Sequence, residues 1–156
     1  MFNIGDKLDK HNYTKGAIWC NENNAVINPD TWIIEAIPAP TLKEVKDQKR
    51  AEINDARDNA RKTEGAEYDG DLFDVDEVSQ SNILAQIKVA EIIGDPEAKY
   101  IYRSKTNTDH LLTLVQLQEL GLAIAVKVNA IYAKSWDLKA QVDKATTAEE
   151  VEAINW

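Results

Sequence analysis

The stretch "EYDGDLFDVD", residues 67–76, decides how the middle of this chain folds. Together with Glu77 it places six carboxylates in eleven residues, around one glycine and several large apolar side chains. Such a stretch could form a calcium loop, a set of catalytic carboxylates, or a tight β-hairpin that leads into a helix. The spacing of its residues discriminates between these structures.

The calcium loop is tested by its register. An EF-hand loop needs oxygen ligands at positions 1, 3 and 5, a glycine at position 6 and a glutamate at position 12. If Gly70 is placed at position 6, position 1 falls on Gly65, which has no side-chain ligand, and position 12 falls on Asp76. The pattern fails at its most demanding positions, so we expect no metal site here.

The hairpin accounts for more of the residues. Asp-Gly is a favoured pair for a type I′ turn, in which both central residues need a positive φ. Asp69 and Gly70 supply that pair. Asp74 or Asp76 would then cap the following helix, with Glu77 in its first turn, where the helix dipole favours a negative charge. The sequence therefore predicts a hairpin whose turn is Asp69 and Gly70.

Helices are predicted on both sides of this hairpin. Residues 41–65 form a polar helix with one thin apolar stripe that includes Leu42 and Val45. Residues 77–93 form the next helix, and Gly94 and Pro96 end it.

The C-terminal half is predicted to contain a strand, its partner and a long helix. Residues 99–104 are predicted as a strand, and residues 110–114 as its partner or as the lead-in to a helix. Residues 113–145 follow as the longest helix, with apolar residues at three- and four-residue steps. A short helix over 146–156 ends the chain.

Residues 1–40 are predicted to form a small β meander. The apolar runs 17–20, 25–27 and 32–37 are short and rich in β-branched and aromatic residues, and Asn- and Asp-rich turns separate them. The segment "PAP" at 38–40 then acts as a proline linker. The expected fold class is α+β, mainly α, with a small attachment module over 1–40 and a mainly helical domain over 41–156.

Composition limits the classes of function. The hydrophobic content of 44% and charged content of 29% are typical of a soluble globular protein. No uninterrupted apolar run approaches the ~18 residues that span a bilayer, and the first residues do not resemble a signal peptide. The net charge of −9 argues against nucleic-acid and acidic-membrane partners. The single cysteine, Cys20, lies in an apolar stretch, so we expect it to pack rather than react.

The residue types of catalysis are sparse and scattered. His11 and His110 lie far apart in the sequence, and we expect each to be structural or exposed. The common motifs of nucleophilic hydrolases, zinc proteases and phosphate-binding loops are absent. The tryptophans could line a sugar site, but side chains spread over several elements are more often core or interface anchors. We therefore expect a protein that is not an enzyme and that has no cofactor.

Residues 49–83 and 133–156 resemble a domain of unknown function that occurs in tailed-bacteriophage and prophage proteins, often encoded near tail-fibre genes. That family typically shows a Lys-Arg-x-x-Ile helix, an aromatic-x-Gly-x-x-Phe-Asp turn and a second helix. The resemblance covers about residues 45–156 and leaves 1–40 outside, although short strands before a similar linker occur in small tail-fibre and assembly proteins. The matching positions are Lys49, Arg50, Ile53, Arg57, Gly70, Phe73, Asp74, Asp76, Ser79, Ile83, Leu138, Lys139, Thr147, Glu150, Val151 and Ile154.

The resemblance implies a tail accessory protein, either a structural component of the fibre or baseplate or an assembly chaperone that is absent from the mature virion. The expected partners are other tail or fibre proteins and further copies of the chain, with a trimer favoured. The expected location is the virion tail, after assembly in the cytoplasm of the bacterial host. The candidate interface residues are Leu42, Val45, Trp19, Trp32 and Trp136.

Overall fold

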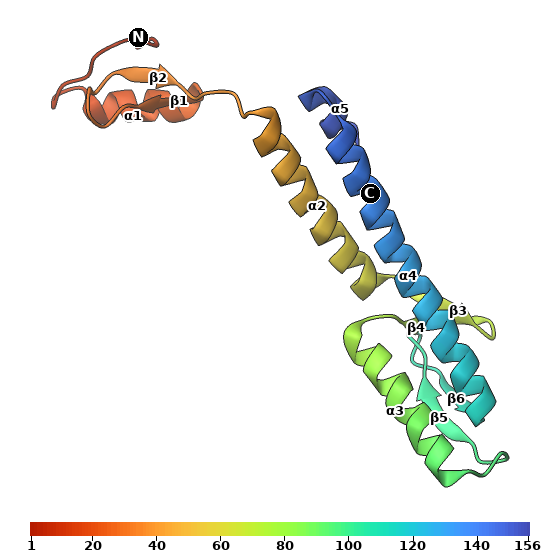
Figure 1. The fold of residues 1–156 in the computed structure, drawn as a ribbon. Coiled ribbons are helices and arrows are strands. Elements are labelled where there is room, and N and C mark those ends of the chain that lie inside the picture. The colour runs from red at the N-terminus through yellow and green to blue at the C-terminus, as the bar shows by residue number, and fades with distance from the viewer. The chain divides into compact units, whose positions relative to one another are not determined.

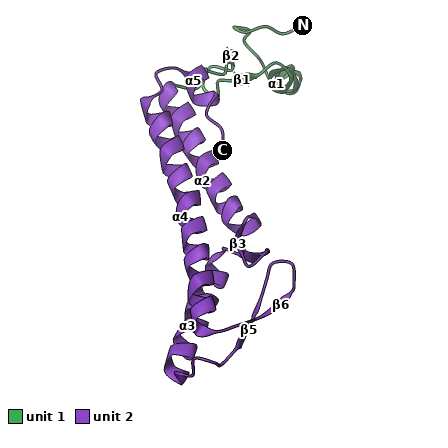
Figure 2. Ribbon diagram, turned by 90° about the vertical axis from the view of Figure 1, so that its right-hand side faces the viewer, with its two compact units in different colours: residues 1–41 green, residues 42–156 purple.

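The computed structural model describes residues 1–156 and confirms the mainly helical α+β class. Five helices and three two-stranded antiparallel hairpins make up the chain (Figure 1). The chain divides into two compact units, Met1–Thr41 and Leu42–Trp156, which Figure 2 colours separately. Each unit has its own apolar core.

The first unit combines one helix with one hairpin. Helix α1 (Tyr13–Glu22) precedes strands β1 (Ala25–Ile27) and β2 (Ile34–Ala36), which pair antiparallel with Ile27 opposite Ile34. The buried residues of its small core are Leu8, Cys20, Ala25 and Ile34. Cys20 is therefore a packing residue, in line with its apolar sequence context.

The strand predicted for residues 17–20 is wrong, because these residues belong to α1. A four-residue apolar run is compatible with a strand or a helix, so its period does not decide. Contact with the preceding segment favours the helix. Gly16 and Cys20, four residues apart, are both buried, and a Cβ at Gly16 would lie 2.5 Å from Leu8 Cδ1. The predicted meander is accordingly a helix followed by a two-stranded hairpin.

The second unit is built along one long helix, α4 (Leu114–Lys144). Helix α2 (Leu42–Thr63) packs on its C-terminal half and runs antiparallel to it. Lys46 Nζ donates to the Asp143 carbonyl at one end, and the Arg61 guanidinium lies 5.4 Å from the ring centre of Tyr132 toward the other. The short helix α5 (Ala148–Glu152) then closes this end against α2.

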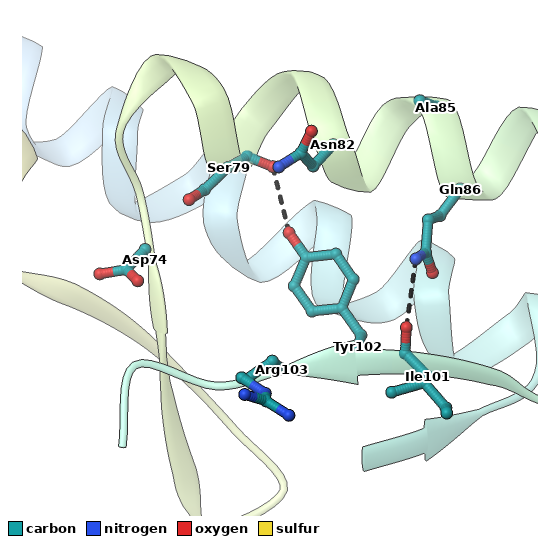
Figure 3. Close-up of a pocket in the computed structure, with 8 residues that line it drawn as sticks. All are labelled: Asp74, Ser79, Asn82, Ala85, Gln86, Ile101, Tyr102 and Arg103. Atoms are coloured by element: carbon teal, nitrogen blue, oxygen red, sulfur yellow. Dashed lines mark hydrogen bonds between the residues drawn. The ribbon is translucent and has the colours of Figure 1, made fainter. Parts of the chain in front are cut away.

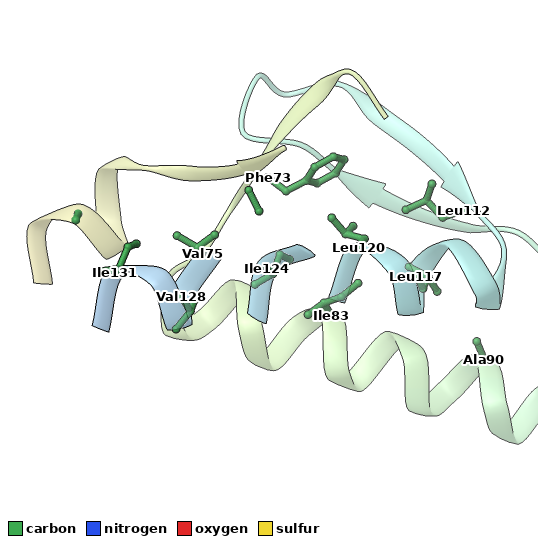
Figure 4. Packing of buried hydrophobic residues seen from close by; sticks show 12 residues of the cluster. Phe73, Val75, Ile83, Ala90, Leu112, Leu117, Leu120, Ile124, Val128 and Ile131 are labelled. Atoms are coloured by element: carbon green, nitrogen blue, oxygen red, sulfur yellow. The ribbon is translucent and has the colours of Figure 1, made fainter. Parts of the chain in front are cut away.

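The N-terminal half of α4 carries α3 and two hairpins. Strands β3 (Gly65–Tyr68) and β4 (Asp71–Asp74) precede α3 (Glu77–Ile93), and strands β5 (Tyr100–Arg103) and β6 (Asp109–Leu112) follow it. Both hairpins and α3 contribute to one core with α4 (Figure 4). The residues of this core that are almost fully buried include Phe73, Val75, Ile83, Leu117, Leu120 and Ile124.

Helix ends follow the sequence signals. The Asp76 side chain accepts a hydrogen bond from the Ser79 N–H and caps α3, and Gly94 ends that helix in the left-handed conformation. Capping boxes form at Thr113 with Gln116 and at Thr147 with Glu150. Local side-chain to backbone bonds therefore fix where α3, α4 and α5 begin.

Candidate functional site

The acidic stretch forms the β3–β4 hairpin. Asp69 and Gly70 make the turn, with φ values of 48° and 78°, and Tyr68 pairs with Asp71 at its base. Nothing lies within 4 Å of a Cβ built on Gly70. Glycine is therefore favoured there by its backbone conformation and not by lack of space.

Asp71 joins this hairpin to the β5–β6 hairpin. Thr106 Oγ1 donates to its carboxylate, with both oxygens at 2.9 Å, and His110 Nε2 lies 3.1 Å from Oδ2. The Leu72 N–H donates to Oδ1 at 2.8 Å. Since an ionised carboxylate only accepts hydrogen bonds, Nε2 of His110 carries the proton in this contact.

These donors stabilise the ionised form of Asp71. The Ser104 hydroxyl, which bonds to Thr106 beside the carboxylate, the His110 side chain and the Leu72 N–H hold the pKa of Asp71 well below its usual range. The half-buried imidazole of His110 also packs on Phe73, with ring centres 5.1 Å apart. The hydrogen-bonded group of Asp71, Leu72, Ser104, Thr106 and His110, here called the Asp71 network, is thus continuous with the apolar core.

The remaining carboxylates of the stretch point to different partners. Asp74 binds Lys105 Nζ at 2.8 Å, Asp76 caps α3, and Glu77 binds Arg61 at 3.0 Å. The Glu67 side chain is exposed. No group of three or more His, Cys, Asp or Glu side chains converges on a point where a metal ion could be held.

The Asp71 network contains the residue types of a catalytic triad in a different arrangement. In a triad, the histidine lies between the carboxylate and the nucleophilic hydroxyl. Here the hydroxyl of Thr106 bonds directly to Asp71, and the hydroxyl of Ser104 bonds to Thr106 at 2.9 Å. The hydrogen bonds of this network therefore connect two hairpins and do not join a base to a nucleophile.

A groove of about 370 Å³ lies between α3 and β5 (Figure 3). Two hydrogen bonds cross it, from Tyr102 OH to the Ser79 carbonyl at 3.1 Å and from Gln86 Nε2 to the Ile101 carbonyl at 3.1 Å. Beside it lies a mainly apolar hollow of about 280 Å³, which is lined by Ala85, Gln86, Val89 and Tyr100. Gln86 Oε1 and Tyr100 OH are buried in the same region without a hydrogen-bond partner.

The five candidate interface residues are divided between the two units. Leu42 and Val45 pack partly buried against the cluster that contains Ile53 and Val142. Trp19 packs on the core of the first unit, and Trp32, with φ 58°, lies against Tyr13 there. Trp136 is 63% exposed on α4. Their role in binding stays a prediction.

Much of the exposed apolar surface was not identified from the sequence. The pattern marks apolar positions but does not say which of them find a partner within the fold. The sequence of residues 77–93 does indicate exposed apolar side chains, because apolar residues occur all around the predicted helix and not along one stripe. The exposed apolar residues of the second unit include Val78, Leu84, Val89, Ile92, Ile93, Ile101, Leu111, Val115, Leu122, Val126 and Trp136.

Helix α4 is long and apolar enough, by length and composition alone, to cross a membrane. Core helices of soluble proteins meet the same criteria. Its buried face, with Leu117, Leu120 and Ile124, packs in the core described above.

Comparison with known proteins matches most of the chain to a protein family. The family model described as "Domain of unknown function (DUF4376)" matches residues 44–155. No curated protein and no solved structure matches the chain. The matched residues correspond to the second unit, which contains the acidic hairpin and its network.

Proposed function

The chain belongs to the DUF4376 family, and we propose that it is a bacteriophage or prophage tail accessory protein, located in the virion tail, that binds another tail protein. The support for a tail role is the resemblance of residues 49–83 and 133–156 to proteins encoded near tail-fibre genes. The proposed function is structural and depends on protein–protein contact.

The observation that carries the proposal is the apolar surface on the outer side of the β5–β6 hairpin and the adjoining side of α3. Ile101 and Leu111 pair across the two strands, and each is 60% exposed. Val89, which lines the hollow beside Tyr100, is also exposed. Exposed apolar residues gathered at one place are typical of a binding surface.

Unpaired polar atoms in the hollow between α3 and β5 also favour a contact in this region. A buried polar atom without a hydrogen bond costs about 1–3 kcal/mol. Gln86 Oε1 and Tyr100 OH are in that condition next to the hollow. A partner segment that seats in the hollow and presents an N–H group to Gln86 Oε1 and a carbonyl to Tyr100 OH would satisfy them, so we extend the contact with the tail protein to this hollow.

The test is the composition of purified particles. In phage particles induced from a strain that carries the gene, mass spectrometry should find the chain in a fixed ratio to the other tail proteins. The double variant Ile101→Glu/Leu111→Glu should fold but be lost from the particles. Leu84→Glu is the matched control, because Leu84 is exposed on the side of α3 opposite Gln86 and should leave incorporation unchanged.

The same experiment separates the alternative function. A chain that occurs in the lysate but never in purified particles would contradict the structural role and would favour the assembly chaperone. In that case, co-expression should raise the yield of folded fibre protein. A fibre protein that folds equally well without the chain would exclude the chaperone as well.

A further inference from the structure

The outer face of α4 carries a regular stripe of residues that the second unit leaves exposed. Two seven-residue series, offset by four positions, run along it. All eight of their residues are exposed, and six of the eight are apolar. The series are Val115, Leu122, Asn129, Trp136 and Glu119, Val126, Ala133, Ala140.

The apolar members of this stripe make little contact with their own chain. Val115, Leu122, Val126 and Trp136 are 60–66% exposed, whereas the opposite face of the same helix forms the core. A helix whose two faces are both apolar is typical of a helix that is covered on both sides. The second unit covers one side only.

We propose that this stripe is a self-association surface, through which α4 packs on α4 of a second copy of the chain. Steps of four and three residues repeated every seven are the pattern by which two helices interlock along their length. This inference goes beyond the proposed function and does not depend on it, since self-association is a property of the isolated chain.

The two polar positions of the stripe fit a second copy. Asn129 lies near the middle of the stripe, so a two-fold axis through the middle would place it next to its own counterpart, and the two amides can bond to each other. Glu119 accepts a hydrogen bond from Tyr68 OH at 2.8 Å, which draws its carboxylate toward the β3–β4 hairpin. Burial and this bond raise the pKa of Tyr68 to about 12, so the phenol stays a donor at neutral pH.

The size of the stripe fits a weak, reversible dimer. From Val115 to Ala140 it extends about 38 Å at 1.5 Å per residue. A contact roughly 10 Å wide along that length covers roughly 400 Å² on each copy, or roughly 800 Å² in the two copies together, which is the size of a weak, transient interface. We therefore expect a reversible dimer, in place of the trimer favoured from the sequence, and a dimer population that depends on concentration.

A lipid bilayer is a less suitable occupant. The stripe contains Glu119 and Asn129, and Asp137 and Lys144 are exposed nearby on the same helix. The net charge of −9 also opposes adsorption to acidic membranes. A second copy accommodates one central amide and charged borders, as protein interfaces commonly do.

Sedimentation velocity of the full chain across a wide concentration range tests the proposal. The wild-type mass should rise from one chain toward two. Leu122→Glu should weaken the association at least about 30-fold, the scale of an interface hot spot, while its circular dichroism and melting temperature stay near wild type. Val126→Glu is a second variant with the same expected result. Ile92→Glu, an exposed apolar position on α3 outside the stripe, is the matched control and should associate like wild type.

Several outcomes would overturn the proposal. The wild-type chain could stay monomeric at every concentration. The variants in the stripe could associate as tightly as wild type, or Ile92→Glu could weaken the association as much as Leu122→Glu does. A monomeric chain that co-sediments with phosphatidylcholine/phosphatidylglycerol vesicles through the stripe would assign the surface to lipid instead.

Discussion

His110 Nε2 lies 3.1 Å from Asp71 Oδ2, and through this contact a residue of β6 holds the turn-side end of β4. The ring of the same histidine packs against Phe73, two residues further along β4. One side chain therefore connects the polar network at the hairpin turn to the apolar core beneath it.

Asp71→Asn should lower the melting temperature at pH 7, because the amide replaces a charged acceptor that receives several hydrogen bonds. The folded pKa of Asp71 is lowered, so its contribution is fully present above the unfolded value of about 3.9 and is lost as the pH falls through the folded value. The difference between wild type and variant should therefore shrink on acidification. Thermal unfolding by circular dichroism between about pH 7 and pH 2 measures it.

Glu67→Gln is the control for this pH series, since Glu67 is an exposed acid on the paired strand β3. It should melt like wild type at neutral pH. If the difference in melting temperature between Asp71→Asn and wild type is the same at all pH values, the ionised carboxylate is not what stabilises the network.

Gly70→Val should destabilise the second unit by about 1–3 kcal/mol, because a β-branched residue is strained at φ 78°. The space around Gly70 is open, so the loss would be conformational and not steric. Gly70→Asn should cost less, since asparagine tolerates the left-handed region. Denaturant unfolding of both variants compares them, and equal losses would show that the turn does not need this conformation.

Phe73→Ala should cost about 3–5 kcal/mol, the usual range for a buried phenylalanine truncated to alanine. Phe73 is fully buried between Tyr68, Tyr102 and His110. Leu72→Ala, one position earlier and 39% exposed, should cost less than about 1.5 kcal/mol. Urea unfolding followed at the helical circular-dichroism band gives the free energy of unfolding of both variants. A similar decrease in Phe73→Ala and Leu72→Ala would show that Phe73 is not at the centre of the core.

The sequence predicted α2, α3, α4 and the hairpin turn because each has a local signal. Asp69-Gly70 specifies its own turn, and Thr113 with Gln116 specifies the start of α4. The Asp71 network had no such signal, since Asp71 and His110 are 39 residues apart and meet only when two hairpins pack. The helix at 17–20 depends in the same way on contact with Leu8, which no local pattern reveals.

Calcium should leave the melting temperature unchanged. The carboxylates of residues 67–77 diverge to Thr106, Lys105, the α3 N-terminus and Arg61, so binding one ion would break existing contacts. Differential scanning calorimetry with millimolar calcium, and with magnesium as the control ion, checks this. A rise of several degrees with calcium alone would show that these acids rearrange to form a site.

Substitutions of Gly121 test how closely α3 packs against α4. A Cβ at this position would lie 3.1 Å from Ile87 Cδ1 and 3.6 Å from Ile83 Cγ1, so the flexible end of Ile87 must shift by a few tenths of an ångström. Replacing glycine by alanine inside a helix stabilises the helix by about 1 kcal/mol. This gain should offset the energetic cost of moving Ile87, so the free energy of unfolding of Gly121→Ala should lie within about 1 kcal/mol of wild type. Gly121→Leu cannot be relieved in this way and should cost about 1–3 kcal/mol. Denaturant unfolding of the pair gives both values. A leucine variant as stable as the alanine variant would mean that α3 moves away from α4 at little cost, and that the contact with Ile87 does not hold the two helices at a fixed distance.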